Sequence, residues 1–161
     1  MNKKVWLRIG LTLIVLVLLY LWMRPQHAER EYGSIIYTNE SGIIKSTTLY
    51  FKGQVVRGVL LFSKSTFNGT LTVDQDLTYK IKLKDSGGYY LGVMTALDAD
   101  HSTRITGVIS ASKKLDRFWI TLTDLDKRYN LKNGEGNIAG PASTLEEAKQ
   151  VGKDILAAYS S

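Results

Sequence analysis

The most regular pattern in the chain is a strict alternation of apolar and polar side chains over residues 77–84. Apolar residues occupy the odd positions, and the even positions carry Thr78 followed by three lysines, Lys80, Lys82 and Lys84. A period of two predicts a β-strand with one buried face and one face in water. The turn-forming sequence Asp-Ser-Gly-Gly at 85–88 then predicts a hairpin in which residues 89–96 form the partner strand.

Short segments of the same kind, divided by turn residues, run from Tyr32 to Thr123. Parallel neighbours would need crossovers of about a dozen residues, and no connection of that length is visible, so we expect antiparallel pairing. The expected architecture is an antiparallel β-meander of about seven or eight strands, forming a sheet or a partly closed barrel. The other expected strands are 42–51 and 54–62 on either side of a Lys52-Gly53 turn, 67–73, 104–111 and 117–123.

The end of the chain predicts one amphipathic helix over residues 144–159. Thr144 and Glu147 have the spacing of a capping box, in which each side chain satisfies a free backbone amide at the helix start. Apolar residues then recur at helical spacing from Leu145 to Tyr159. A loop ending at Pro141 is expected before this helix. The predicted fold class is therefore α+β, with the terminal helix packed on the sheet.

The start of the chain carries an uncharged apolar run from Ile9 to Met23. Counted over residues 5–23 the segment has 19 residues, close to the roughly 20 that a helix needs to cross a bilayer. We expect a transmembrane signal-anchor helix over 5–23, with basic residues at its ends and aromatic residues at the two membrane interfaces. The residues assigned to this membrane anchor are Lys3, Lys4, Trp6, Arg8, Tyr20, Trp22 and Arg24.

A cleaved secretory signal peptide is the alternative interpretation of this segment. Its apolar core is longer than the 7–15 residues typical of signal peptides, and Ala28 has Gln26 rather than a small residue two positions earlier, so retention is favoured. The basic excess before the helix predicts an amino terminus inside the cell. The expected organisation is a cytoplasmic terminus at 1–4, the anchor, a linker at 24–31, and an extracytoplasmic domain at 32–161, single-pass in the cytoplasmic membrane.

The charge balance argues against nucleic acid as a partner. The whole chain has a formal net charge of +6. The segment after the anchor carries 18 basic and 15 acidic residues, a net charge of +3, which is too small to imply nucleic-acid binding. The chain contains no cysteine, which excludes disulfides, thiolate metal ligands and cysteine nucleophiles.

The polar loop at 98–102 holds the nearest approach to a catalytic set, because Asp98, Asp100 and Ser102 surround His101. Such residues also satisfy loop backbone groups, and we favour that structural role. Asp-x-Asp pairs at 74/76, 98/100 and 124/126 have spacing that can share calcium, but none continues into a twelve-residue calcium loop, so acidic turns are favoured. We therefore predict no enzyme activity and assign no catalytic, cofactor-binding or metal-binding residues.

The leading functional hypothesis is a noncatalytic, membrane-anchored extracytoplasmic interaction module in a cell-envelope assembly, secretion or sensing complex. Its expected partners are the lipid bilayer and an envelope protein. The alternative is a ligand-binding domain for anionic lipid or cell-wall polymer, which would use the basic strip of Lys80, Lys82 and Lys84 or an aromatic groove. An enzyme that depends on His101 or Asp100 is the third hypothesis.

Overall fold

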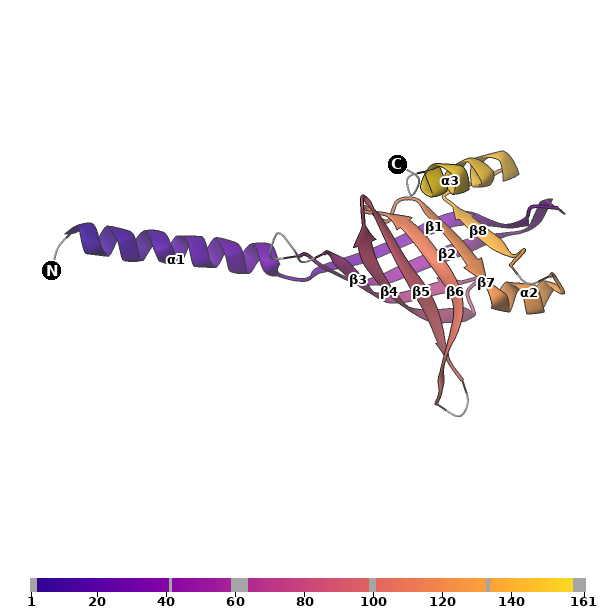
Figure 1. Ribbon diagram of the computed structural model, residues 1–161, viewed down its shortest axis with the longest axis horizontal. Coiled ribbons are helices and arrows are strands. Elements are labelled where there is room, and N and C mark those ends of the chain that lie inside the picture. The colour runs from indigo at the N-terminus through magenta and orange to yellow at the C-terminus, as the bar shows by residue number, and fades with distance from the viewer. Residues whose placement is uncertain (1–2, 41, 59–63, 99–100, 133, 158–161) are drawn as a thin grey trace.

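Eight antiparallel strands form a closed barrel in a computed structural model, which describes residues 3–40, 42–58, 64–98, 101–132 and 134–157 (Figure 1). Neighbouring strands follow the order of the sequence, and β1 pairs with β8 to close the wall. The strands are β1 (Gln26–Thr38), β2 (Gly42–Val56), β3 (Thr66–Val73), β4 (Leu77–Ser86), β5 (Tyr89–Leu97), β6 (Thr103–Ser112), β7 (Phe118–Leu122) and β8 (Asn137–Gly140).

Three helices accompany the barrel in the described part of the chain: α1 (Lys3–Met23), α2 (Thr123–Tyr129) and α3 (Leu145–Ala157). The helix α1 projects away from one end of the barrel, and α2 lies at the other end (Figure 1). The helix α3 packs against β1, β7 and β8 on the outside of the wall. The expected antiparallel meander is confirmed, but the fold is mostly β and the barrel is fully closed, whereas an α+β fold with a sheet or a partly closed barrel was expected.

The barrel interior is filled by side chains, because the inward residues of every strand alternate with outward residues. The ring centroids of Phe51 and Phe118 lie 5.2 Å apart there, and those of Tyr32 and Phe118 lie 5.7 Å apart. A second apolar layer lies between α3 and the outer face of the wall, where Ile35, Tyr37, Ala139 and Ala148 belong to one buried cluster. Other fully buried members of the interior include Leu49, Phe67, Leu71, Leu83, Met94, Ile109 and Ile120.

The strands predicted from alternation are present with small changes of boundary. The β4–β5 hairpin is confirmed, with Ser86 paired to Tyr89 and a two-residue turn in which Gly87 and Gly88 have positive φ. The expected turn at Lys52-Gly53 is wrong, since β2 continues through both residues to Val56. The rest of the expected strand 54–62 lies partly outside the described residues, because the structure does not describe 59–63.

Three further boundaries differ from the sequence-based expectation. The strand β1 begins at Gln26, inside the segment 24–31 that was expected to be a linker. The expected strand 117–123 ends at Leu122, where α2 begins, and the expected loop before Pro141 contains β8. All four residues of β8 are buried, because one face lines the barrel and α3 covers the other, so this strand shows no alternation.

The C-terminal helix has the predicted capping box. The Glu147 amide donates to Thr144 Oγ1 at 3.2 Å, and the Thr144 amide donates to Glu147 Oε2 at 3.3 Å. The described helix α3 runs from Leu145 to Ala157. Residues 158–159 of the expected helix lie outside the described residues.

The helix expected over 5–23 is present as α1. Within the described residues, however, no helix combines the length and the apolar character needed to cross a membrane. The transmembrane part of the expectation is therefore not supported.

Candidate functional site

The outer wall of the barrel between β4 and β6 gathers the predicted lysines and several exposed apolar side chains. Lys80, Lys82 and Lys84 are all exposed on β4, as the alternation predicts. Register places Lys82 beside Val93 of β5, and Val93 beside Val108 of β6. Lys84 is paired with Leu91 in the next row. Because residues opposite each other in adjacent strands share a face, the lysines border an apolar surface.

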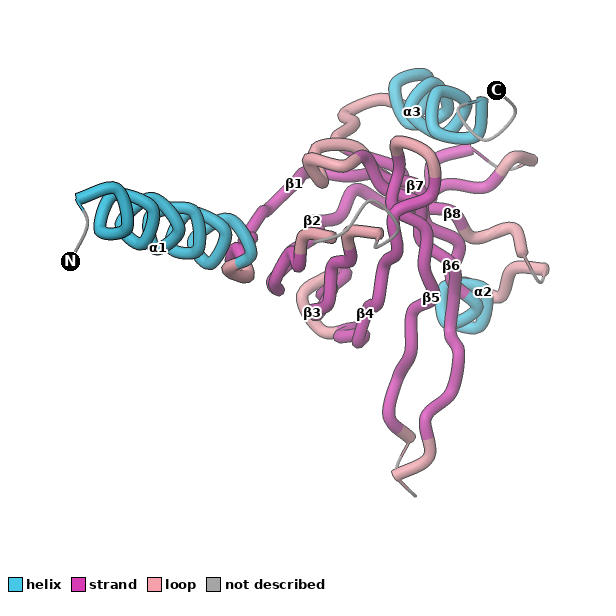
Figure 2. Tube along the Cα trace, turned by 60° about the vertical axis from the view of Figure 1, so that its left-hand side comes forward, coloured by secondary structure: helices cyan, strands magenta, loops and turns pink. Residues whose placement is uncertain are grey.

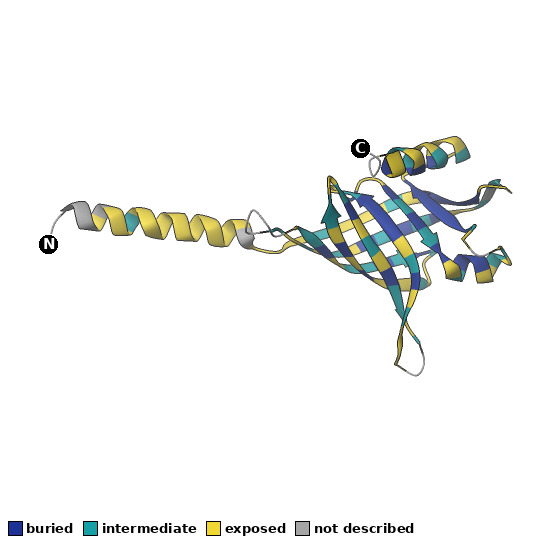
Figure 3. Cartoon of the chain, in the orientation of Figure 1, coloured by how far each residue is buried: buried dark blue, intermediate teal, exposed yellow. Residues whose placement is uncertain are grey.

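This apolar surface, here called the β5–β6 patch, consists of Leu91, Val93, Leu97, Ile105 and Val108. Their exposed fractions are 39%, 42%, 57%, 64% and 43%, respectively. Figure 3 shows buried positions alternating with exposed or intermediate ones along the barrel strands. Outward residues of a solvated wall are usually polar, so an apolar group of this size on neighbouring strands is unusual.

The β5–β6 patch extends onto a ribbon that leaves the barrel. Figures 1 and 2 show the far ends of β5 and β6 continuing beyond the wall as a two-stranded arm. Leu97 is paired with Thr103, and Ile105 is paired with Thr95 near a register shift at Met94/Thr95. The two most exposed members of the patch, Leu97 and Ile105, therefore lie on this arm. The arm presents apolar side chains away from the barrel's own core.

Arg104, which lies on the arm near its tip, links the arm to the barrel. Its Nε lies 3.3 Å from Asp98 Oδ2, and its Nη1 lies 3.3 Å from Asp124 Oδ1 in α2. Hydrogen bonds to these two carboxylates raise the pKa of the Arg104 guanidinium. The ion pairs link the strand that carries the patch to a helix at the barrel end, which limits the orientations that the arm can take.

The wall formed by β7, β8 and β1 is covered by the protein itself. Gly152 of α3 lies against Trp119 and Tyr37, and a Cβ at this position would lie 3.2 Å from Trp119 Cδ1. The outward surfaces of β1, β7 and β8 are therefore occupied by α3, whereas the β5–β6 patch has no such cover from the described residues.

The described carboxylates of the Asp-x-Asp pairs are held by groups of the protein. Arg128 bridges Asp74 and Asp76, with N–O distances of 3.2 Å and 3.0 Å, and Lys45 also pairs with Asp74. Hydrogen bonding from Arg128 lowers the pKa of Asp76. Asp98 and Asp124 share Arg104, as described above. These carboxylates therefore act as partners of basic side chains.

Asp126 has a different role, because it is only 2% exposed. Its two carboxylate oxygens accept the backbone amides of Gly134 and Gly136, each at 2.8 Å. The side chain thus holds the loop between α2 and β8. Within the described residues, no three His, Asp or Glu side chains come together in a group that would hold a metal ion.

The predicted His101 cluster lies at the tip of the arm. His101 is exposed with a φ of 64°, and its amide donates to the Asp98 carbonyl at 3.0 Å. The Asp98 amide donates to the Ser102 carbonyl at 2.9 Å, so backbone bonds close this loop. Asp100 lies outside the described residues.

The predicted anchor residues lie along α1 and just after it. The described side chains of α1 between Ile9 and Trp22 are exposed apart from Gly10, as Figure 3 shows. Trp6 lies near the start of the helix, and Tyr20 and Trp22 lie near its end, where Arg24 follows. Arg8 is exposed, whereas the side chains of Lys3 and Lys4 are outside the described set.

These features define a closed up-and-down antiparallel barrel with a projecting N-terminal helix and an apolar arm. Comparisons with protein-family models, with curated proteins and with solved structures found no match. The register that creates the β5–β6 patch could not be found from the sequence, because outward apolar residues in a strand look like core residues until the pairing is known.

Proposed function

We propose that this chain is a noncatalytic interaction module, held at the outer face of the cytoplasmic membrane by α1, that binds an envelope protein through the β5–β6 patch. The observation that carries this proposal is the group of exposed apolar side chains on β5 and β6, which extends onto the projecting arm. The assembly would serve envelope construction, secretion or sensing.

The energetics of the patch support a protein partner. Removing a half-exposed Val or Leu side chain from water is worth about 1 kcal/mol. Five such side chains, together with backbone rows already fixed by strand pairing, offer a preorganised surface at small entropic cost. Lys82 and Lys84 border the patch in register, so the complementary surface would be apolar at its centre and acidic at that border.

The proposed anchor rests on the exposed apolar side chains of α1. A helix that is apolar on all sides needs a nonaqueous environment or apolar neighbours around it. In this proposal lipid supplies that environment, the amino terminus is inside, and the barrel is outside. Resistance to alkaline carbonate extraction would support a spanning helix, whereas release by carbonate would indicate a peripheral attachment.

Site-specific photocrosslinking in intact cells tests the interaction surface. A photoreactive amino acid would replace Val93 or Val108 in the patch, and Gln54 or Asn68 on the exposed faces of β2 and β3 would serve as controls. We expect one discrete protein adduct from the patch positions and none from the controls. Equal adducts from both walls, or none from the patch, would contradict the proposal.

The alternative proposal is binding of anionic lipid or wall polymer by the lysine strip. The observation in its favour is that Lys80, Lys82 and Lys84 are exposed on one strand face. Replacing all three with Gln should then abolish salt-sensitive binding to anionic vesicles or wall polymer. If that binding exists and survives the triple replacement, the lysine strip is not its site.

A further inference from the structure

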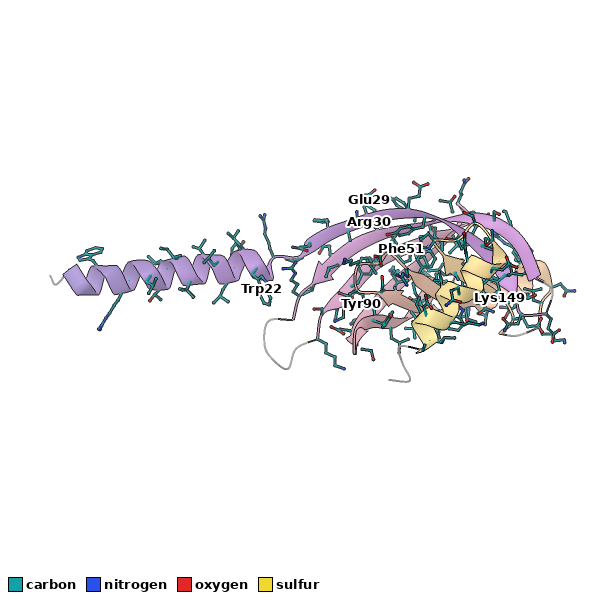
Figure 4. The ribbon with its side chains drawn as sticks, turned by 90° about the horizontal axis from the view of Figure 1, so that it is seen from above. Trp22, Glu29, Arg30, Phe51, Tyr90 and Lys149 are labelled. Atoms are coloured by element: carbon teal, nitrogen blue, oxygen red, sulfur yellow. The ribbon has the colours of Figure 1, made fainter. Side chains whose placement is uncertain are left out.

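A basic pocket of about 490 Å³ lies at the end of the barrel that faces α1. Its lining comes from strands β1 and β2, from residues 113–115 and from the end of α1. Figure 4 shows Trp22 at the end of α1 that meets the barrel, with Arg30 and Tyr90 on the barrel beyond it. This pocket is separate from the β5–β6 patch and from the lysine strip.

The pocket is lined by four Lys and Arg side chains, which are Arg30, Arg57, Lys113 and Lys114. Its described lining contains no acidic residue. Lys113 is paired with Asp85. Arg57 is half-buried and donates to the Gln26 side-chain oxygen at 3.2 Å. Neither Arg57 nor Lys114 forms an ion pair with an acidic residue in the described part of the chain. The pocket therefore holds positive charge that the surrounding protein does not neutralise.

Apart from His27 and Gln26, the rest of the lining is apolar or carries a hydroxyl group. Val55 and Leu115 belong to the barrel core or pack against it, and Trp22 adds an aromatic ring from α1. The pKa of the Tyr90 hydroxyl is raised, mainly by burial and also by the charge of Asp85. The hydroxyl is therefore protonated at neutral pH and can donate a hydrogen bond. A lining with guanidinium, ammonium and hydroxyl donors beside apolar side chains matches a phosphate ester attached to an apolar body.

The position of the pocket selects the source of that phosphate. Because α1 leaves the barrel from this end, a membrane that holds α1 would meet the barrel at Trp22, and tryptophan is enriched at headgroup depth. We propose that the pocket binds the phosphate of an anionic phospholipid from the membrane in which α1 is anchored. Arg57 and Lys114 are the principal contacts. This inference rests on the anchoring part of the proposed function.

Titration of the full chain in detergent micelles with phosphatidylglycerol or phosphatidylcholine, followed by native mass spectrometry, tests the site. The test variant is Arg57→Gln with Lys114→Gln. The control variant, Lys127→Gln with Lys153→Gln, removes the same charge from exposed positions on α2 and α3. Loss of two charge-assisted contacts should weaken phosphatidylglycerol binding about tenfold or more, whereas the control should change it less than about twofold.

Several outcomes would overturn the inference: equal weakening in both variants, no weakening in either, or no preference for phosphatidylglycerol over phosphatidylcholine. Tight binding of free glycerol phosphate, with no gain from the acyl chains, would assign the pocket to a soluble phosphate ester instead. The single variant Lys114→Gln, on an exposed side chain, repeats the test if the double variant unfolds.

Carbonate extraction and crosslinking from Val93 separate this test from the proposed function. If the protein resists extraction and crosslinks to its partner, yet shows no preference for phosphatidylglycerol, only the inference of a lipid site is wrong. If carbonate releases the protein from membranes, yet the protein binds phosphatidylglycerol in micelles through Arg57 and Lys114, the proposed spanning anchor is wrong and the phosphate site is supported.

Discussion

Gly53 and Gly69 face each other across β2 and β3, and a Cβ built on either residue would lie 2.7 Å from the Cα of the other. The Phe67 ring lies equally close to a Cβ at Gly53. Two strands approach here more closely than side chains would permit, and the ring packs over the contact. Glycine at position 53 thus serves close packing within a strand, and it does not mark a turn.

We expect Gly53→Ala to destabilise the barrel by about 2 kcal/mol, because the new methyl group overlaps backbone atoms that cannot move independently. Urea unfolding of the two proteins measures the difference. Gly33→Ala in β1 is the matched control, since a Cβ at Gly33 meets nothing within 4 Å. A similar loss in both variants would indicate a general cost of removing glycine and would contradict this explanation.

Asp126→Ala should cost about 3 kcal/mol, because it leaves the amides of Gly134 and Gly136 without their buried acceptor. Chemical unfolding measures the loss, and hydrogen exchange should accelerate at these two amides. Asp154→Asn is the comparison: this carboxylate is 41% exposed and pairs with Arg117 at 3.4 Å, so the expected change is below about 0.5 kcal/mol. Unchanged exchange at Gly134 and Gly136 would rule out the proposed role of Asp126.

The contact between Asp76 and Arg128 predicts a pH-dependent contribution to stability. The pKa of Asp76 in the folded state lies below its ordinary value of 3.8, because Arg128 donates hydrogen bonds to the carboxylate. The contact therefore stabilises the fold fully above that value and is lost as the pH falls through the folded-state pKa. The stability difference between the protein and Asp76→Asn should shrink between pH 5 and pH 2. A difference that stays constant over this range would contradict the assignment.

Replacement of both Val93 and Val108 by Ser should strongly reduce partner binding while leaving the barrel folded. Both side chains are about 40% exposed, so the double replacement should lower the free energy of unfolding by about 2 kcal/mol or less. Co-isolation of the crosslinked partner should fall about tenfold, which is the effect of losing about 1.4 kcal/mol of binding free energy. The matched control is Thr70→Ser with Thr72→Ser on β3. Retained partner binding in the Val93 and Val108 variant would exclude the patch.

The sequence predicted the elements whose local pattern is decisive. The alternation from Leu77 to Lys84 marks a half-buried strand, and Thr144 with Glu147 marks a helix start, and both are confirmed. The turn predicted at Gly53 is wrong because glycine occurs both in turns and at close contacts between strands. The strand β8 and the helix α2 were missed because β8 is buried on both faces and α2 has only seven residues.

The candidate sites also divide into those that a local sequence pattern predicts and those that depend on strand pairing. The exposed lysines on β4 follow from alternation alone. The β5–β6 patch depends on the pairing of Val93 with Val108, and the basic pocket joins Arg30, Arg57 and Lys114 from separate parts of the chain. Such groupings arise from the register and closure of the barrel, which no short segment encodes.

Closure of the barrel also determines how any partner can recognise this wall. Val93 has Lys82 on one side and Val108 on the other, so both hydrogen-bonding edges of its strand are already occupied. An incoming chain cannot add itself there as another strand. Recognition must therefore read the identity and shape of side chains, which makes the specificity of this surface adjustable by single substitutions while the backbone stays the same.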